Sequence, residues 1–333
     1  MSDLQTPSPA PTSSVPPGTG SKARWGLEGL ALGVALGGVG RPGDWQRHFE
    51  RLGQCEALGL HSVWLPEMHF APGACSTPLS LLAAFAAKST KLRLGTTSLL
   101  LPIHHPVQLA DEVSDLRALS GDRVILGLGR GFRRPLFEAF QVPAQSKRNR
   151  FDDHLEAMLV RWAGRGEGPP PMGVAAFGRK GLAQAAHHGL PYLPSPLESL
   201  DLIAENLSFH AAALSPEKNA APLAVPLMRT VFVSEDEAAV RSVLEAIERE
   251  ARALQVGRVP AALGRAAKAP IESRVLVGSP SQVRHELARY RERIGVDLLI
   301  ARIEVPGVAP KILEASLEAL ATEVVPALVS APS

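Results

Sequence analysis

The chain has 333 residues, 45% of them hydrophobic, which is enough for one large α/β barrel or two ordinary domains. Its formal net charge is +2, and lysine and arginine are scattered without a basic stripe, so we expect no nucleic acid among its partners. The two cysteines, Cys55 and Cys75, lack metal-site spacing, which predicts no metal and a reducing, cytoplasmic location.

The amino-terminal segment has the composition of a tail. Residues 1–22 are rich in proline, serine and threonine and lack the apolar stretch of a signal peptide. We predict a disordered tail over residues 1–25 and a single domain over residues 26–333. The apolar run over residues 27–39 is rich in glycine and shorter than the roughly 20 residues that cross a bilayer. The sequence therefore predicts no membrane partner.

Strand and helix patterns alternate through the rest of the chain. Apolar, β-branched runs are typical of strands covered on both faces, and apolar residues at a helical period indicate amphipathic helices. Because hairpin signals and a G-x-G-x-x-G fingerprint are both missing, the pattern favours a parallel (β/α)₈ barrel over a doubly wound sheet. The first seven predicted strands cover residues 30–36, 61–66, 92–101, 123–129, 173–176, 191–193 and 227–233, and an eighth is expected in the closing stretch at residues 275–304. The main predicted helices cover 44–58, 79–89, 107–119, 150–162, 182–188, 200–214, 235–254 and 305–327.

Four stretches carry a family resemblance: GTTSLLLPIHHPVQLADEVSDLRALSGDRVILGLGRGF (residues 95–132), EALGLHSVWLPEMHF (56–70), VFVSEDEAAV (231–240) and VLVGSPSQVRHELARYRERIGVDLLIARIE (275–304). In spacing and composition they resemble the bacterial luciferase-like flavin-dependent monooxygenases. The resemblance implies a (β/α)₈ TIM barrel that binds reduced flavin mononucleotide (FMN) or a deazaflavin at the carboxyl ends of its strands. Residues 255–273 have no counterpart in the family pattern, and we expect them to form a mobile insertion.

The carboxyl ends of the strands are where a barrel of this kind builds its site. By the resemblance, an arginine after the fourth strand approaches the flavin phosphate, a Thr-Ser pair joined by a non-proline cis peptide lies beneath the flavin ring, and a glycine-bounded loop after the fifth strand binds phosphate. The predicted cofactor contacts are Glu67, Thr97, Ser98, Arg130, Gly178, Arg179, Lys180 and Gly181.

Three histidines follow strands in the same region, and histidine titrates near neutral pH, which suits proton transfer. We therefore predict catalytic roles for His69, His104 and His105. Met68 stands where luciferase has the histidine that is implicated in its catalysis. The alternative for each histidine is a structural role; for His104 and His105, this would be shaping the turn before Pro106.

The favoured function is a two-component monooxygenase that oxidises a lipophilic organic substrate with molecular oxygen and reduced FMN, which a separate flavin reductase supplies. The resemblance also implies a homodimer or a heterodimer with a related subunit. One alternative is a deazaflavin-dependent hydride-transfer enzyme of the same superfamily. Another is a non-catalytic partner subunit or flavin-binding homologue, which Met68, the short loop at residues 163–171 and the altered loop at residues 178–181 favour.

Overall fold

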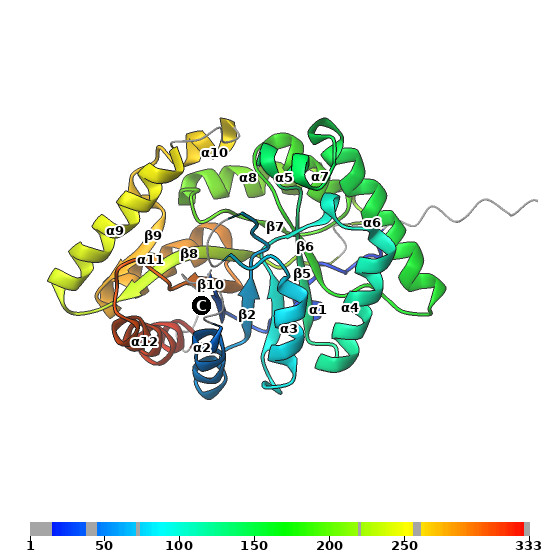
Figure 1. Cartoon of the computed structure of the whole chain (residues 1–333). Coiled ribbons are helices and arrows are strands. Elements are labelled where there is room, and N and C mark those ends of the chain that lie inside the picture. The colour runs from blue at the N-terminus through cyan, green and yellow to red at the C-terminus, as the bar shows by residue number, and fades with distance from the viewer. Residues whose placement is uncertain (1–14, 38–44, 71–73, 219–220, 256–260, 330–333) are drawn as a thin grey trace, which may run out of the picture.

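The computed structural model describes residues 15–37, 45–70, 74–218, 221–255 and 261–329. One parallel sheet organises them, with strand order β7-β6-β5-β3-β2-β1-β10-β8-β9 and β4 paired with β5. The sheet curls so that β7 lies beside β8, and helices surround it (Figure 1). This arrangement confirms the predicted barrel. The strands are β1 (Ala31–Ala35), β2 (Ser62–Leu65), β3 (Arg93–Thr96), β4 (Leu99–Leu100), β5 (Val124–Gly129), β6 (Met172–Ala175), β7 (Tyr192–Leu193), β8 (Pro226–Val233), β9 (Val275–Gly278) and β10 (Leu298–Arg302).

Helices follow most of the strands, as the sequence predicted. They are α1 (Lys22–Trp25), α2 (Gln46–Ala57), α3 (Pro78–Ala86), α4 (Pro106–Ser120), α5 (Arg134–Ala139), α6 (Lys147–Gly164), α7 (Arg179–His187), α8 (Leu200–Ala213), α9 (Glu237–Gln255), α10 (Ala261–Ala266), α11 (Pro280–Ile294), α12 (Pro310–Ala319) and α13 (Val325–Val329). Short 3₁₀ turns lie at Leu101–Ile103, Ala144–Ser146 and Ile271–Ser273, and a π-helical turn lies at Leu320–Val324.

Helix α11 shows how local sequence sets an element. Ser279 caps its amino terminus in a capping box with Gln282, and Pro280 occupies the first turn. Gly295 ends the helix with φ +67°, a conformation that glycine adopts without the usual side-chain penalty. Because these signals are local in sequence, the first and last residues of α11 can be predicted from the sequence alone.

Two segments differ from their predictions. The strand predicted over residues 92–101 is divided into β3 and β4, because the chain turns at Thr97 and Ser98. The described part of the predicted insertion, residues 261–273, contains α10 and a 3₁₀ turn. Ile271 belongs to a smaller, separate hydrophobic cluster with residues of β8, β9 and α9, among them Phe232, Val275 and Val243. The end of the insertion is therefore held by apolar contacts at Ile271, and residues 256–260 lie outside the described residues.

The interior of the barrel is filled by large side chains at its amino-terminal end. The rings of Trp25 and Trp64 pack with centroids 5.9 Å apart, and both side chains are fully buried. Space for Trp64 depends on glycine, since a Cβ on Gly95 would lie 2.3 Å from its ring. The barrel is thus a packed core below its mouth, as in other barrels of this type.

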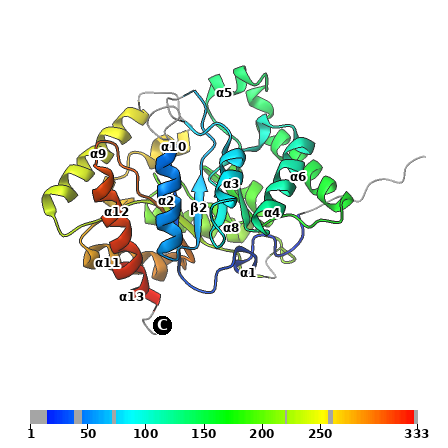
Figure 2. The ribbon, with the colours of Figure 1, turned by 60° about the horizontal axis from the view of Figure 1, so that its bottom comes forward.

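The predicted tail boundary at residue 25 is wrong. Residues 22–25 form α1, which lies at the opposite end of the barrel from α5 and α10 (Figure 2). Lys22 pairs with Asp297 at 2.7 Å, and Arg24 donates a hydrogen bond to the carbonyl oxygen of Pro169. Burying a tryptophan removes a large apolar area from water, which offsets the entropy of ordering this segment. Residues 1–14 lie outside the described residues.

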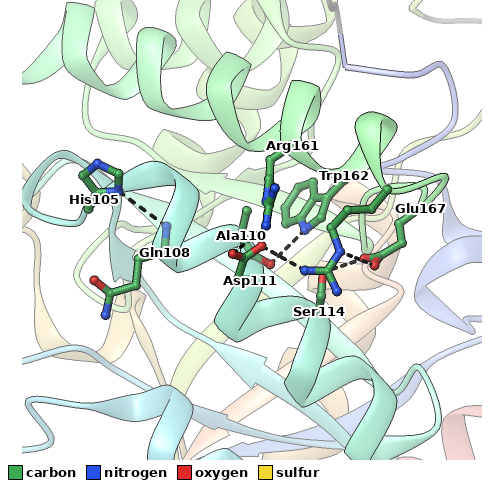
Figure 3. Close-up of polar contacts among 9 residues, drawn as sticks. His105, Gln108, Ala110, Asp111, Ser114, Arg161, Trp162 and Glu167 are labelled. Atoms are coloured by element: carbon green, nitrogen blue, oxygen red, sulfur yellow. Dashed lines mark hydrogen bonds and ion pairs between the residues drawn. The ribbon is translucent and has the colours of Figure 1, made fainter.

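Helices α4 and α6 are joined by a polar seam on the outside of the barrel (Figure 3). The Trp162 indole donates to the carbonyl oxygen of Ala110 at 3.1 Å, and Arg161 makes a two-pronged ion pair with Asp111. Exposed ion pairs contribute little, about 0 to 1 kcal/mol, so the buried indole bond and apolar packing hold the pair together. These contacts hold α6 against α4. The amino-terminal half of α6 lies near the candidate functional site, which is described below.

Among the described residues, we find no helix with both the length and the apolar character needed to cross a membrane.

Replacing Trp25 tests whether α1 closes the barrel. Trp25→Ala should lower the free energy of unfolding by about 3 to 5 kcal/mol, because it leaves a cavity against Trp64. Urea unfolding followed by circular dichroism measures the loss. Leu119→Ala is the control, since this leucine is 68% exposed and its loss should change stability by less than about 0.5 kcal/mol. Equal effects of the two variants would contradict the assigned packing.

Candidate functional site

A buried carboxylate lies at the carboxyl ends of β2 and β4. Glu67 accepts a hydrogen bond from His69 Nε2 at 2.8 Å and from His104 Nε2 at 2.9 and 3.0 Å. Its Oε2 atom also accepts the backbone N–H of Leu100 at 2.6 Å. The side chain of Glu67 is 1% exposed, against 12% for His69 and 27% for His104. The structure thus brings together two of the three histidines predicted from sequence.

The surroundings of Glu67 favour its charged form. Burial by itself raises its pKa, but the hydrogen bonds and charge of His104, with the bonds from Leu100 and His69, lower it further. The net result is a pKa below the ordinary glutamate value, so Glu67 is a carboxylate at neutral pH. Among the described residues, no three His, Cys, Asp or Glu side chains are arranged to hold a metal ion. A carboxylate bonded to two imidazoles is suited to proton transfer, since histidine exchanges protons near neutral pH.

The predicted cis peptide between Thr97 and Ser98 is present. It lies directly beside the glutamate, because the Ser98 carbonyl oxygen accepts the backbone N–H of Glu67 at 3.2 Å. On the other side β5 approaches closely, since a Cβ on Gly129 would lie 2.1 Å from Ser98 Oγ. Both Thr97 and Ser98 remain partly accessible. Their contact with a flavin ring stays a prediction.

Apolar side chains surround His69 at the mouth. Its ring packs edge-on against Phe140, with centroids 5.0 Å apart, and lies 5.8 Å from Phe70. Phe70 and Met68 are 65% and 43% exposed, which is unusual for large apolar side chains. This end of the barrel therefore presents an apolar surface next to the polar glutamate and histidine pair.

His105 is placed differently. It is the N-cap of α4, where its ring accepts the backbone N–H of Gln108 at 3.5 Å (Figure 3). The structure does not bring it to Glu67, although it is adjacent in sequence to His104. Sequence proximity could not separate the two, because side chains of neighbouring residues take different directions at the start of a helix.

A second polar group lies at the carboxyl end of β5. Arg130 donates from Nη1 to Gln184 Oε1 at 2.8 Å, and the amide of Gln184 donates in turn to Asp152 at 2.8 Å. The guanidinium lies against the first turn of α7, since a Cβ on Gly181 would be 2.4 Å from Arg130 Nη2. Glycine at position 181 therefore permits this close approach.

Other cations gather around Arg130. Burial lowers the pKa of Arg130 to about 10; Arg148 lowers it as well, and Asp152 raises it. Burial also lowers the pKa of Lys147, and the charges of Arg130 and Arg148 add to this effect. Arg130 and Lys147 are thus partly buried and Arg148 is exposed, and their charges act on one another, an arrangement that an anion stabilises.

The residues of the glycine-bounded loop, 178–181, lie in two different environments. Gly178 is the N-cap of α7 with φ +70°, and Gly181 underlies Arg130. The side chain of Arg179 is 71% exposed; it pairs with Glu205 and lies over the ring of Phe209. Lys180 is exposed as well. The predicted role of these four residues in cofactor binding stays a prediction.

Sequence reasoning missed Lys147, Arg148, Asp152 and Gln184, which complete the group around Arg130. The first three lie within a predicted or adjoining helix, where charged residues are ordinary on a solvated face. Their approach to Arg130 depends on the packing of α6 beside α7, which one sequence does not reveal.

The carboxylate of Glu67 makes a testable contribution to stability. Its pKa is depressed in the folded state, so the contribution is full above the ordinary value of 4.5 and is lost as the pH falls through the lower folded value. We expect the stability difference between the wild type and Glu67→Gln to shrink between pH 7 and pH 3 in urea unfolding. The stability difference between the wild type and Glu198→Gln should change with pH in the opposite direction, because burial raises the pKa of Glu198. Parallel behaviour of the two variants would contradict the assignment.

Comparison with known proteins places this geometry in a family. The family model "Luciferase-like monooxygenase" matches residues 29–298. A luciferase-like monooxygenase of Escherichia coli K12 is 40% identical over 76 residues, which are 22% of this chain and 23% of that protein. The chain matches less than two thirds of the length of this and other first-ranked curated relatives.

Solved structures match over a much greater length. The monooxygenase RslO1 from Streptomyces bottropensis superposes with a TM-score of 0.76 and 26% identity, covering 90% of this chain and 99% of that one. The oxygenating constituent of 3,6-diketocamphane monooxygenase from Pseudomonas putida, in complex with FMN, gives 0.73 and 17% over 90% and 98%. A coenzyme F420-dependent tetrahydromethanopterin reductase from Methanopyrus kandleri gives 0.63 and 17% over 90% and 99%. The last two likenesses concern the fold. With most of its length matched by the family model, this chain belongs to the luciferase-like monooxygenase family, a family of oxidoreductases.

Proposed function

We propose that this protein is a flavin-dependent monooxygenase that uses reduced FMN from a separate reductase and oxidises a lipophilic organic substrate with molecular oxygen. The observation that carries this proposal is the guanidinium of Arg130 against the first turn of α7, with Lys147 and Arg148 close enough for their charges to interact with it. Positive side chains and free backbone N–H groups at a helix start are what a phosphate monoester requires.

The residues present fit a flavin phosphate. Arg130, which lies against the first turn of α7 at Gly181, would hold the phosphate, and this turn would supply backbone donors. Lys147 and Arg148 would balance its charge, since Asp152 already bonds to Gln184 and His188. Thr97 and Ser98 would support the ring at the mouth of the barrel.

The chain itself supplies orientation, shielding and proton transfer. A bound reduced flavin would supply the activation of oxygen. His69 and His104, held by Glu67, would exchange protons with the substrate, and Met68, Phe70 and Phe140 would exclude water from an apolar substrate. The FMN complex of the diketocamphane enzyme supports this choice of cofactor through the shared fold.

Partners and location follow from the same proposal. We expect a flavin reductase as the source of reduced FMN and a homodimer or a heterodimer with a related subunit, in the cytoplasm. Leu109, Val113 and Leu116 on α4 are buried within one chain, where they cover the strands. A dimer face on α4 would therefore use its other side, which carries Val107 and Gln108.

Anaerobic titration tests the function. Reduced FMN should bind at micromolar concentration or below and quench the tryptophan fluorescence, and admission of oxygen should then oxidise the bound flavin at a rate different from free flavin. Binding of a deazaflavin alone would replace the proposal with the hydride-transfer alternative, as the F420-dependent reductase of the same fold allows. Binding of neither would indicate the non-catalytic homologue.

The phosphate site has its own test. Arg130→Ala should weaken FMN binding by about tenfold or more, because a hydrogen bond to a charged group contributes about 1.5 to 3 kcal/mol. Riboflavin lacks the phosphate, so its affinity should be the same for the wild type and the variant. Arg134→Ala is the matched control, since this arginine is exposed on α5 and pairs with Glu138. Equal losses for FMN and riboflavin would contradict a phosphate role for Arg130.

A further inference from the structure

The two histidines at the mouth contact Glu67 through the same ring atom. His69 and His104 both present Nε2 to the carboxylate, at 2.8 to 3.0 Å. They come from different segments, one after β2 and the other after the 3₁₀ turn that follows β4. No described residue forms a hydrogen bond with Nδ1 of either ring. One buried side chain therefore bonds to the same nitrogen of both rings.

A carboxylate can only accept hydrogen bonds, so each bonded Nε2 must carry its hydrogen. In a neutral imidazole this leaves Nδ1 without a hydrogen and with a lone pair. We propose that Glu67 is a positioning residue that fixes His69 and His104 in the Nε2–H tautomer, so that Nδ1 of each ring is the atom that accepts a proton during the reaction. This inference deepens the proposed function and rests on it for its chemical meaning.

The proton balance of such a step is simple. The bond between the substrate oxygen and its hydrogen breaks, the proton forms a new bond to Nδ1, and the electron pair stays on the substrate oxygen. The imidazolium then donates to Glu67 from Nε2, and the carboxylate stabilises its positive charge at close range. The substrate class is thus an organic molecule with a weakly acidic hydroxyl or enol group, next to the apolar side chains around His69.

The pattern of hydrogen bonds around Glu67 makes the assignment testable at atomic level. Oε2 accepts the backbone N–H of Leu100, which is always a donor, so in Glu67→Gln the amide oxygen must take this place. The amide nitrogen then takes the place of Oε1, facing His69 Nε2. Two donors cannot face each other, so His69 must change to the Nδ1–H tautomer. His104 Nε2 lies 2.9 Å from Oε2 and 3.0 Å from Oε1, so the amide oxygen can still accept its hydrogen and His104 is not the ring that discriminates.

Histidine tautomers are read directly from long-range ¹H–¹⁵N correlation spectra of the full chain labelled with ¹⁵N-histidine, without flavin, at about pH 8, where imidazoles are neutral. His69→Asn and His104→Asn assign the signals. We expect Nε2–H for both rings in the wild type, and a change to Nδ1–H at His69 in Glu67→Gln. Glu198→Gln, which changes another buried carboxylate that bonds to Asn206, should leave both rings unchanged.

An Nδ1–H tautomer at either ring of the wild type would overturn the inference, as would an unchanged His69 in Glu67→Gln. If that variant does not fold, the wild-type spectrum decides alone. The experiment contains no flavin, so its outcome is independent of the FMN titration. Correct tautomers in a protein that binds no flavin would end the proposed function and leave the role of Glu67 standing.

Discussion

The burial of one carboxylate sets the arrangement of the mouth of the barrel. An ionised glutamate removed from water is costly unless hydrogen bonds replace its hydration. Glu67 obtains them from His69, which follows β2, from the backbone of Leu100, which ends β4, and from His104, which follows β4. Because the charge must be satisfied, the ends of these two strands and the histidines that follow are held in fixed relation.

The group around Arg130, which we propose as the phosphate site, has the opposite kind of imbalance. Around Arg130 positive charge is in excess, with Lys147 and Arg148 nearby and Asp152 engaged by Gln184 and His188. Such a group gains from an anion, whereas the carboxylate of Glu67 already has its hydrogen bonds satisfied. In the proposed function, the charged phosphate of FMN would lie at Arg130 and its largely apolar ring near the mouth of the barrel.

Much of the fold was predictable because its signals are local. Buried strands and amphipathic helices carry their periodicity within a few turns, and the capping box at Ser279 marks a helix start by residue type. The predicted tail boundary at residue 25 is wrong because Trp25 packs against Trp64, which is distant in the sequence. The division of the strand at Thr97 and Ser98 was likewise invisible in an apolar run, although the family resemblance had indicated the cis peptide.

The sequence by itself determined the family, the barrel and the strand ends that carry the site, since these follow from patterns of neighbouring residues. Only the tertiary structure separated His104 from His105 and added Lys147, Arg148 and Gln184 to Arg130. It also showed that Glu67 bonds to two histidines. The physical reason is that hydrogen bonds and charges act through space at a few ångströms, between segments whose distance along the chain carries no information about their approach.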